Sequence, residues 1–199
     1  MNKIDFLVAG VGGQGTILAS DILAEVGMEA GYDAKKSDVL GLAVRGGSVL
    51  SHVRWGRTVA SPVSRKGTID YLLGFEPLEA LRGTEFLHPQ STALVNTQPI
   101  PPVSVSSGDA IYPAKERLEQ ILHAVTANVY FVEATEEAIG LGSSKVTNVV
   151  MIGAFSALLD VPVEVWEKVI LSRVPEKYSQ LNKAAFFAGR ELIQGARIS

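Results

Sequence analysis

The stretch Gly10-Val11-Gly12-Gly13-Gln14-Gly15 decides the fold that we expect for this chain. An apolar run, residues 4–9, precedes it, and residues 16–26 carry apolar side chains at helical spacing. Strand, glycine turn and helix are the first elements of a βαβ unit. Gly10, Gly12 and Gly15 also match the G-x-G-x-x-G spacing of loops that bind a phosphate at a helix N-terminus.

Two interpretations of this loop stay open. In the first, backbone N–H groups approach an anion closely because no side chains intervene, and the helix N-terminus adds partial positive charge. In the second, the loop is a tight turn in which glycine supplies positive φ and close helix–strand packing. No Lys-Ser or Lys-Thr pair follows Gly15, so the loop is not a Walker A sequence. A dinucleotide site would need an acid about 20 residues further on, and Asp38 lies near that place.

The chain beyond the loop alternates between strands and helices. Residues 32–39 read as the second strand, so residues 1–39 predict a βαβ unit with a parallel strand pair and a right-handed crossover. Residues 48–55 predict a third strand, and residues 58–61 a short hairpin return before Pro62. An antiparallel pair at this place would make the sheet mixed.

The remaining elements complete an α/β pattern. Strands are expected over residues 68–75, 90–96 and 128–133, and helices over residues 76–82, 113–126, 134–139, 148–159, 162–172 and 177–194. Thr147 or Asn148 is available to cap the helix that begins there. The sequence therefore predicts a single domain over residues 1–199, a three-layer α/β/α Rossmann-like fold. Its sheet is mixed and mainly parallel, and its C-terminal portion is helical.

Composition narrows the possible functions. The net charge of −3 argues against a broad nucleic-acid-binding face. There is no run of about 18 apolar residues that would span a membrane. The chain starts directly with a strand and not with a signal peptide, so we expect a cytoplasmic protein. Without cysteine it cannot hold an iron–sulfur cluster on its own thiolates, and its three histidines show no metal-ligand spacing.

Polar residues at strand ends are the candidate site residues, because ligands gather at the carboxyl edge of open α/β sheets. Ser37 and Asp38 end the second strand, with a strand-end cap as the alternative role, and Asn96 ends a later strand or belongs to a plain turn. Arg45 stands before Gly46-Gly47 and could hold a carboxylate or phosphate in bidentate fashion. A structural salt bridge or a subunit contact is its alternative. No catalytic residue is predicted in this chain.

Several motifs in order along the chain resemble one family. Residues 10–15, 30–33 and 45–54 closely resemble the small (beta) subunit of indolepyruvate:ferredoxin oxidoreductase. That subunit is equivalent to the gamma subunit, or domain III, of the wider 2-oxoacid:ferredoxin oxidoreductases. Residues 74–81, 95–102, 148–154 and 173–175 look like the same family. Leu40 and Val44 stand where the indolepyruvate branch tends to carry His and Gln, which leaves the 2-oxoacid itself open.

The resemblance implies an accessory role in the oxidative decarboxylation of a 2-oxoacid, such as an aryl pyruvate, to an acyl-CoA with ferredoxin as electron acceptor. Thiamine diphosphate and iron–sulfur clusters belong to that reaction, and neither is assigned to this chain. The chain has no cysteine to hold a cluster. The thiamine-binding signature, Gly-Asp-Gly followed by Asn-Asn, is also missing, because Gly108-Asp109 is followed by Ala110 and no Asn-Asn pair occurs. The resemblance therefore implies a large partner subunit that bears both cofactors. Ferredoxin would be an indirect partner, and coenzyme A would approach between the subunits.

Two competing readings remain. One is a stand-alone nucleotide- or dinucleotide-binding protein that uses the same loop. The other is a homodimer without ligand, in which the glycines serve only packing. Under the favoured reading, the residues expected to face a ligand or the partner subunit are Gly10, Gly12, Gly13, Gln14, Gly15, Ser37, Asp38, Arg45, Gly46, Gly47 and Asn96.

Overall fold

The computed structural model describes residues 3–41 and 46–196, with side chains as far as residue 194. Within these residues the strands form one six-stranded sheet in the order β2-β3-β1-β4-β5-β6. The strands are β1 (Ile4–Val11), β2 (Asp33–Leu40), β3 (Ser48–Gly56), β4 (Ile69–Gly74), β5 (Leu87–Asn96) and β6 (Asn128–Val132).

The strand directions confirm a mixed, mainly parallel sheet. β1, β4, β5 and β6 pair in parallel, whereas β3 is antiparallel to both of its neighbours, β1 and β2. β1 and β2 run in the same direction, as expected for residues 1–39, but they do not pair directly, because β3 lies between them. The burial pattern explains this order. Val53 and Trp55 of β3 are fully buried, whereas β2 carries Lys35 and Lys36, charged residues that suit an edge strand.

The expected hairpin return over residues 58–61 is also absent from the described sheet. Side chains of β2 form hydrogen bonds with the backbone groups of Val59, which would otherwise be free to pair with a strand. Val59 donates its N–H to Asp33 at 2.7 Å, and the ammonium of Lys35 donates to the Val59 carbonyl. The segment after β3 is therefore a loop fastened to the edge strand by side chains.

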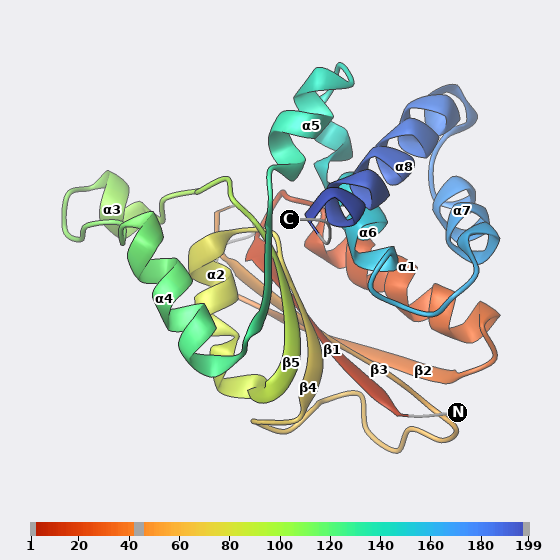
Figure 1. The fold of residues 1–199 in the computed structure, drawn as a ribbon, viewed down its shortest axis with the longest axis horizontal. Coiled ribbons are helices and arrows are strands. Elements are labelled where there is room, and N and C mark those ends of the chain that lie inside the picture. Colours follow the sequence, from red (N-terminus) through yellow and green to blue (C-terminus); the bar gives the residue numbers. More distant parts are fainter. Residues whose placement is uncertain (1–2, 42–45, 197–199) are drawn as a thin grey trace.

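Helices cover both faces of the sheet in three layers (Figure 1). The short helix α3 and three 3₁₀ turns were not expected from the sequence. The helices are α1 (Thr16–Glu29), α2 (Pro77–Arg82), α3 (Val103–Ser106), α4 (Lys115–Val125), α5 (Ala134–Gly140), α6 (Thr147–Ser156), α7 (Val163–Ser172) and α8 (Ser179–Ala196). The 3₁₀ turns are η1 (Thr84–Phe86), η2 (Ser144–Val146) and η3 (Glu176–Tyr178). Across the described parts of the chain, no helix has the length and apolar character needed to cross a bilayer.

Alternation along the central strand β1 separates two cores. Phe6 and Val8 pack in the larger cluster under α1, α6, α7 and α8, while Leu7 and Ala9 pack in the smaller cluster under α2 and α4. A central strand that is buried on both faces reads as a continuous apolar run, as residues 6–9 do. The three-layer α/β/α arrangement expected from the sequence is thereby confirmed.

The helical C-terminal portion is held by a close crossing of α6 and α8. A Cβ added at Gly153 would lie 2.0 Å from the Phe186 carbonyl oxygen, and one added at Gly189 would lie 2.0 Å from the Val150 carbonyl oxygen. Each glycine therefore lets the backbone of the other helix approach. This crossing leaves α6 buried along its length, and the start of α6 lies beside the glycine loop.

Candidate functional site

The glycine loop lies against the diglycine turn that precedes β3. Gly12 donates its N–H to the Gly47 carbonyl at 2.8 Å, and Gly46 donates its N–H to the Gly12 carbonyl at 3.3 Å. Two segments that the sequence singled out separately are thus joined backbone to backbone. Arg45 itself lies outside the described residues. Directly after the turn, Ser48 donates to the Glu79 carboxylate of α2 at 2.5 Å, which fixes the turn from the other side.

Gln14 shapes the loop from within. Its Oε1 accepts from the Val11 N–H at 2.8 Å, and its Nε2 donates to the Phe75 carbonyl at 2.9 Å. Asn96, which is fully buried at the end of β5, donates to the same carbonyl at 3.2 Å and to Thr135 Oγ1 at 3.0 Å. The amide of Gln14 and the NH₂ group of Asn96 are therefore engaged inside the protein, and they set the geometry that the loop presents, while Asn96 Oδ1 is buried without a partner among the described residues.

The loop glycines serve different purposes. A Cβ at Gly10 would lie 2.7 Å from Thr16 Oγ1 and 2.9 Å from Phe75 Cβ, so Gly10 is required by close packing. Gly13 and Gly15 have φ of +107° and +79°, which favour glycine. A Cβ at Gly13 would meet nothing within 4 Å, whereas one at Gly15 would lie 2.9 Å from Asn148 Nδ2. The packing role thus holds at Gly10, and Gly13 leaves its surroundings open.

Two helix N-termini meet at this loop. α1 starts with Gly15 as its N-cap, α6 starts with Val146 as its N-cap, and neither helix has a side-chain cap. The cap expected from Thr147 or Asn148 is wrong, because Thr147 Oγ1 donates to the Ser144 carbonyl at 2.8 Å. The first N–H groups of α1 lack partners within the helix and carry partial positive charge, whereas α6 continues from η2 and the Thr147 N–H donates to the Ser144 carbonyl. The arrangement favours an anion near Gly15.

Two pockets flank the loop. One, which we call the apolar pocket, has a volume of about 400 Å³ and is lined by Val11, Gly12, Gly13, Gly15, Thr16, Ile17, Leu40, Gly41 and Val49. The other, which we call the Lys145 pocket, has a volume of about 300 Å³ and is lined by Gly13, Gln14, Gly15, Gln98, Ile100, Thr135, Ser144, Lys145, Thr147 and Asn148. Gly13 and Gly15 belong to both, so the loop is the wall between them.

The Lys145 pocket has the chemistry of an anion site. Of the described residues that line it, none is acidic, and Lys145 brings a positive charge on an exposed side chain. Asn148 is only 7% exposed and lines the pocket with its amide beside Gly15. The sequence carries no sign of a ligand role for these two residues, because a lysine and an asparagine are common at the start of a helix. What distinguishes them is that the fold places them beside the glycine loop, which is far away in the sequence.

Ser37 and Asp38 lie apart from both pockets. Asp38 accepts from the Ser51 hydroxyl at 2.6 Å and forms an ion pair with Lys36 at 3.1 Å, and the ammonium of Lys36 also reaches Asp21 of α1. The acid that a dinucleotide site would use for a ribose is therefore bound into the contact between β2 and α1.

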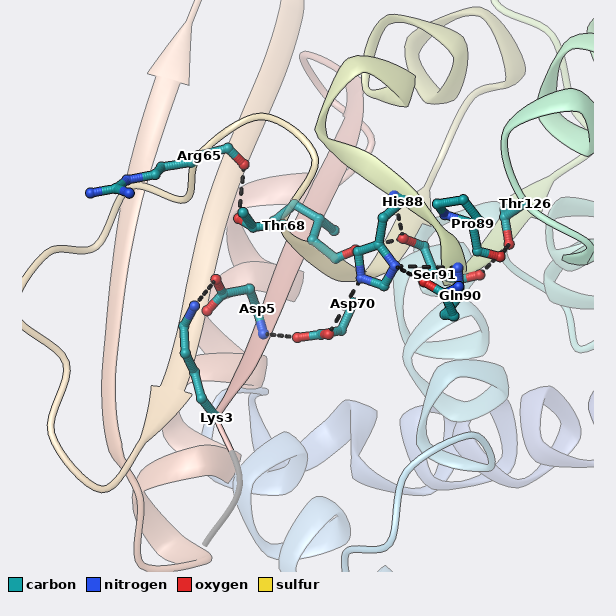
Figure 2. A network of polar contacts seen from close by, with 11 residues as sticks. Lys3, Asp5, Arg65, Thr68, Asp70, His88, Pro89, Gln90, Ser91 and Thr126 are labelled. Carbon is teal, nitrogen blue, oxygen red and sulfur yellow. Dashed lines mark hydrogen bonds and ion pairs between the residues drawn. The ribbon is translucent and has the colours of Figure 1, made fainter.

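A second group of ionisable residues lies at the opposite edge of the sheet, where β1 and β4 begin (Figure 2). The buried carboxylate of Asp5 pairs with Lys3 at 2.8 Å and with Arg54 at 2.9 Å. The Asp5 N–H donates to Asp70 at 2.7 Å, and Asp70 lies 3.7 Å from His88. These contacts tie strand starts together. Among residues 3–41 and 46–196, no group of three His, Cys, Asp or Glu side chains is placed to hold a metal ion.

His52 of β3 is 2% exposed and packs edge-on against Phe86, with ring centroids 5.2 Å apart. Burial lowers its pKa from the usual 6.5, and the Arg54 charge lowers it further, while Asp5 opposes this. A neutral, enclosed imidazole fits the structural role that alternation within a strand suggested.

Comparison with known proteins identifies the family. Residues 5–192 match the family described as pyruvate ferredoxin/flavodoxin oxidoreductase. The chain is 35% identical over 192 residues to "Indolepyruvate oxidoreductase subunit IorB" of Thermococcus kodakarensis, with 95% of each chain covered. It is 37% identical over 189 residues to the protein of the same name from Archaeoglobus fulgidus, with 94% of each covered.

A solved structure agrees. The gamma subunit of a keto/oxoacid ferredoxin oxidoreductase from Geobacter sulfurreducens superposes with a TM-score of 0.70 at 28% identity, covering 96% of this chain and 99% of that one. The match runs from end to end of these small subunits, which confirms the resemblance drawn from the motifs. The chain therefore belongs to the pyruvate ferredoxin/flavodoxin oxidoreductase family and is of its small-subunit type.

Proposed function

We propose that this chain is the accessory subunit of a cytoplasmic, indolepyruvate-type 2-oxoacid:ferredoxin oxidoreductase, and that residues 1–199 form one gamma-type domain. The complex would convert an aryl pyruvate to an acyl-CoA and pass electrons to ferredoxin. Relatives named as indolepyruvate oxidoreductase subunits support this substrate class. The chain's own residues do not fit an iron–sulfur cluster, because it has no cysteine. A large partner subunit would hold the clusters and thiamine diphosphate.

The residues that line the Lys145 pocket give the main support for a coenzyme A site on this chain. Coenzyme A brings phosphate groups, and the pocket offers the Lys145 ammonium, the start of α1 at Gly15 and an open backbone at Gly13. Lysine binds phosphate as a point charge, and a helix N-terminus adds N–H donors. The pocket would therefore hold a phosphate of coenzyme A while its thiol end reaches the partner's reaction centre. This chain would set the affinity and orientation of coenzyme A.

The apolar pocket faces the partner subunit in this proposal. Ile17 and Leu40, two of its lining residues, are 40% and 58% exposed, so apolar side chains stay open to solvent beside the pocket. Their position next to the diglycine turn supports a shared contact surface with the loop. Arg45, outside the described residues, directly precedes Gly46, which bonds to Gly12. We propose, from its place in the sequence, that Arg45 binds the substrate carboxylate or a coenzyme A phosphate.

Co-purification tests the subunit assignment. The chain is co-expressed with the product of the neighbouring reading frame and isolated by a tag on one partner. A stable complex that turns over an aryl pyruvate is the expected result, and Arg45→Ala should lower that turnover. The assignment is wrong if the two chains never associate. Tight binding of NAD, FAD or FMN to the isolated chain would instead indicate the stand-alone nucleotide-binding protein.

A further inference from the structure

Glu76 is a buried carboxylate that the proposed function does not yet use. Its residue is 1% exposed, and it stands at the N-cap of α2. Its Oε2 accepts from the Glu79 N–H at 2.9 Å, and its Oε1 accepts from the Ile100 N–H at 3.1 Å and from the Tyr112 hydroxyl. Within residues 3–41 and 46–194 it forms no ion pair with a basic side chain, so hydrogen-bond donors alone offset its burial.

The donors explain why a carboxylate stands at this position. All three groups present a hydrogen and need an acceptor, and an ionised carboxylate offers acceptors on both oxygens. A glutamine would turn an NH₂ group toward at least one of these donors. Burial, first, and then the hydrogen bond to Glu76 raise the pKa of Tyr112, so its phenol stays protonated and keeps donating.

Ile100 and Tyr112 lie at the two ends of one segment. Residues 98–112, which we call the strap, run from the end of β5 to the start of α4 and include α3. In Figure 1 the strap passes above α2 and carries α3 out to the edge of the molecule. Both of its ends bond to the same oxygen of Glu76. A single buried side chain thus closes this loop onto the body of the domain.

The first residues of the strap form a wall between two pockets. Gln98 and Ile100 line the Lys145 pocket. Pro99, between them, lines a separate pocket of about 260 Å³ on the other side, together with Pro77, Tyr112 and Phe131. Alternate residues of this wall thus line different pockets, and the Ile100 N–H in the wall is bonded to Glu76. Releasing that bond would free the wall from α2.

We propose that Glu76 is a positioning residue, which latches the strap so that Gln98 and Ile100 stay in place as the wall of the Lys145 pocket. The inference rests on the proposed role of that pocket in coenzyme A binding. Glu76 does not touch the ligand. It acts through the strap, and it therefore affects the affinity for coenzyme A more than the rate at saturation.

The test compares Glu76→Gln with the matched control Glu119→Gln in the complex with the partner subunit. Glu119 lines the pocket behind the strap, but within the described residues it makes no hydrogen bond with the strap backbone, and its 3.8 Å ion pair with Lys115 lies on the surface of α4. We expect peptides covering residues 98–112 to exchange amide hydrogens about tenfold faster in Glu76→Gln. We expect the KM for coenzyme A to rise about tenfold with kcat within about twofold of wild type. The control should change neither.

Each outcome decides something. If exchange in the strap is unchanged in Glu76→Gln, the latch does not exist and the inference is overturned. If exchange rises while the KM for coenzyme A stays the same, the strap does not position the pocket, and the inference is again overturned. If Lys145→Ala leaves that KM unchanged, the proposed coenzyme A role fails, which is a separate result. Should Glu76→Gln not fold, Tyr112→Phe removes one strap bond and keeps the cap of α2, with smaller changes in the same directions expected.

Discussion

The side-chain amides of Gln14 and Asn96 donate to one acceptor, the Phe75 carbonyl, at 2.9 Å and 3.2 Å. One amide comes from the glycine loop and the other from the end of β5, so this carbonyl joins the ends of β1, β4 and β5. Phe75 also donates its own N–H to the Ala9 carbonyl at 2.7 Å. The loop is therefore held in one shape from within before any ligand arrives.

Gln14→Glu should destabilise the protein. The substitution would point a carboxylate oxygen at the Phe75 carbonyl, which loses a hydrogen bond and adds repulsion. We expect a loss of about 1–3 kcal/mol in the free energy of unfolding. Urea denaturation measures it, with Gln120→Glu on the exposed face of α4 as the control that should stay within about 0.5 kcal/mol. Equal stability of the two variants would show that the shared carbonyl contributes little.

Lys145→Ala should weaken coenzyme A binding by the complex. Removing the positive charge from the pocket should raise the KM for coenzyme A about tenfold and leave kcat at saturating coenzyme A nearly unchanged. Steady-state kinetics at varied coenzyme A measure both. Lys168→Ala is the control, because Lys168 lies on α7 and pairs with Glu29 at the surface. A lower kcat with an unchanged KM would contradict a binding role for Lys145.

Gly189→Ala should disrupt the crossing of α6 and α8. The added Cβ would lie 2.0 Å from the Val150 carbonyl oxygen, so the helices would have to separate. We expect a loss of about 3 kcal/mol in the free energy of unfolding. Gly140→Ala at the end of α5 is the matched control, because a Cβ there meets nothing within 4 Å. Thermal unfolding of both variants gives the comparison, and a normal Tm for Gly189→Ala would refute the close crossing.

Stability should fall in mild acid because of His52. Its pKa is lowered in the folded protein, so the unfolded chain binds a proton first as the pH falls below about 6.5. The stabilising contribution of the neutral ring is therefore complete above that pH and is lost below it. Urea midpoints at pH 7.5 and pH 5.5 should differ less in His52→Leu than in wild type. His123→Gln, at an exposed position, is the control and should keep the wild-type difference between the two midpoints. If His52→Leu also keeps that difference, the loss of stability in acid does not come from His52.

Much of the fold could be predicted because periodicity and glycine spacing are local signals. The strand before Gly10 and the helix after Gly15 follow from them, as do the helices of the C-terminal portion. The order of strands could not be predicted in the same way. The insertion of β3 between β1 and β2 depends on which faces are buried in the finished sheet. Lys35 and Lys36 suit an edge strand, but they do not indicate which strand pairs with β1.

In the candidate site, too, single residues could be predicted from the sequence, whereas the contacts between them could not. Gly12 and Gly46 were singled out from the sequence, yet the hydrogen bond between them joins segments that no spacing rule connects. Lys145 gave no signal, since a lysine before a helix is common. Lys145 lies beside the glycine loop because α6 packs closely against α8 and begins next to Gly15. Asp38 matched a spacing rule, but the antiparallel β3 supplies Ser51 as its partner.

Hydrogen exchange of the complex with and without coenzyme A tests whether the glycine loop and the Lys145 pocket hold the ligand. We expect coenzyme A to slow exchange in two segments that are distant in the sequence, residues 10–17 and residues 143–149, by about tenfold each. Both effects should shrink to about twofold in Lys145→Ala at the same coenzyme A concentration, because a tenfold weaker affinity leaves the ligand only partly bound. Protection confined to the partner subunit, with both segments of this chain unchanged, would contradict the claim that the glycine loop and the Lys145 pocket together hold the ligand.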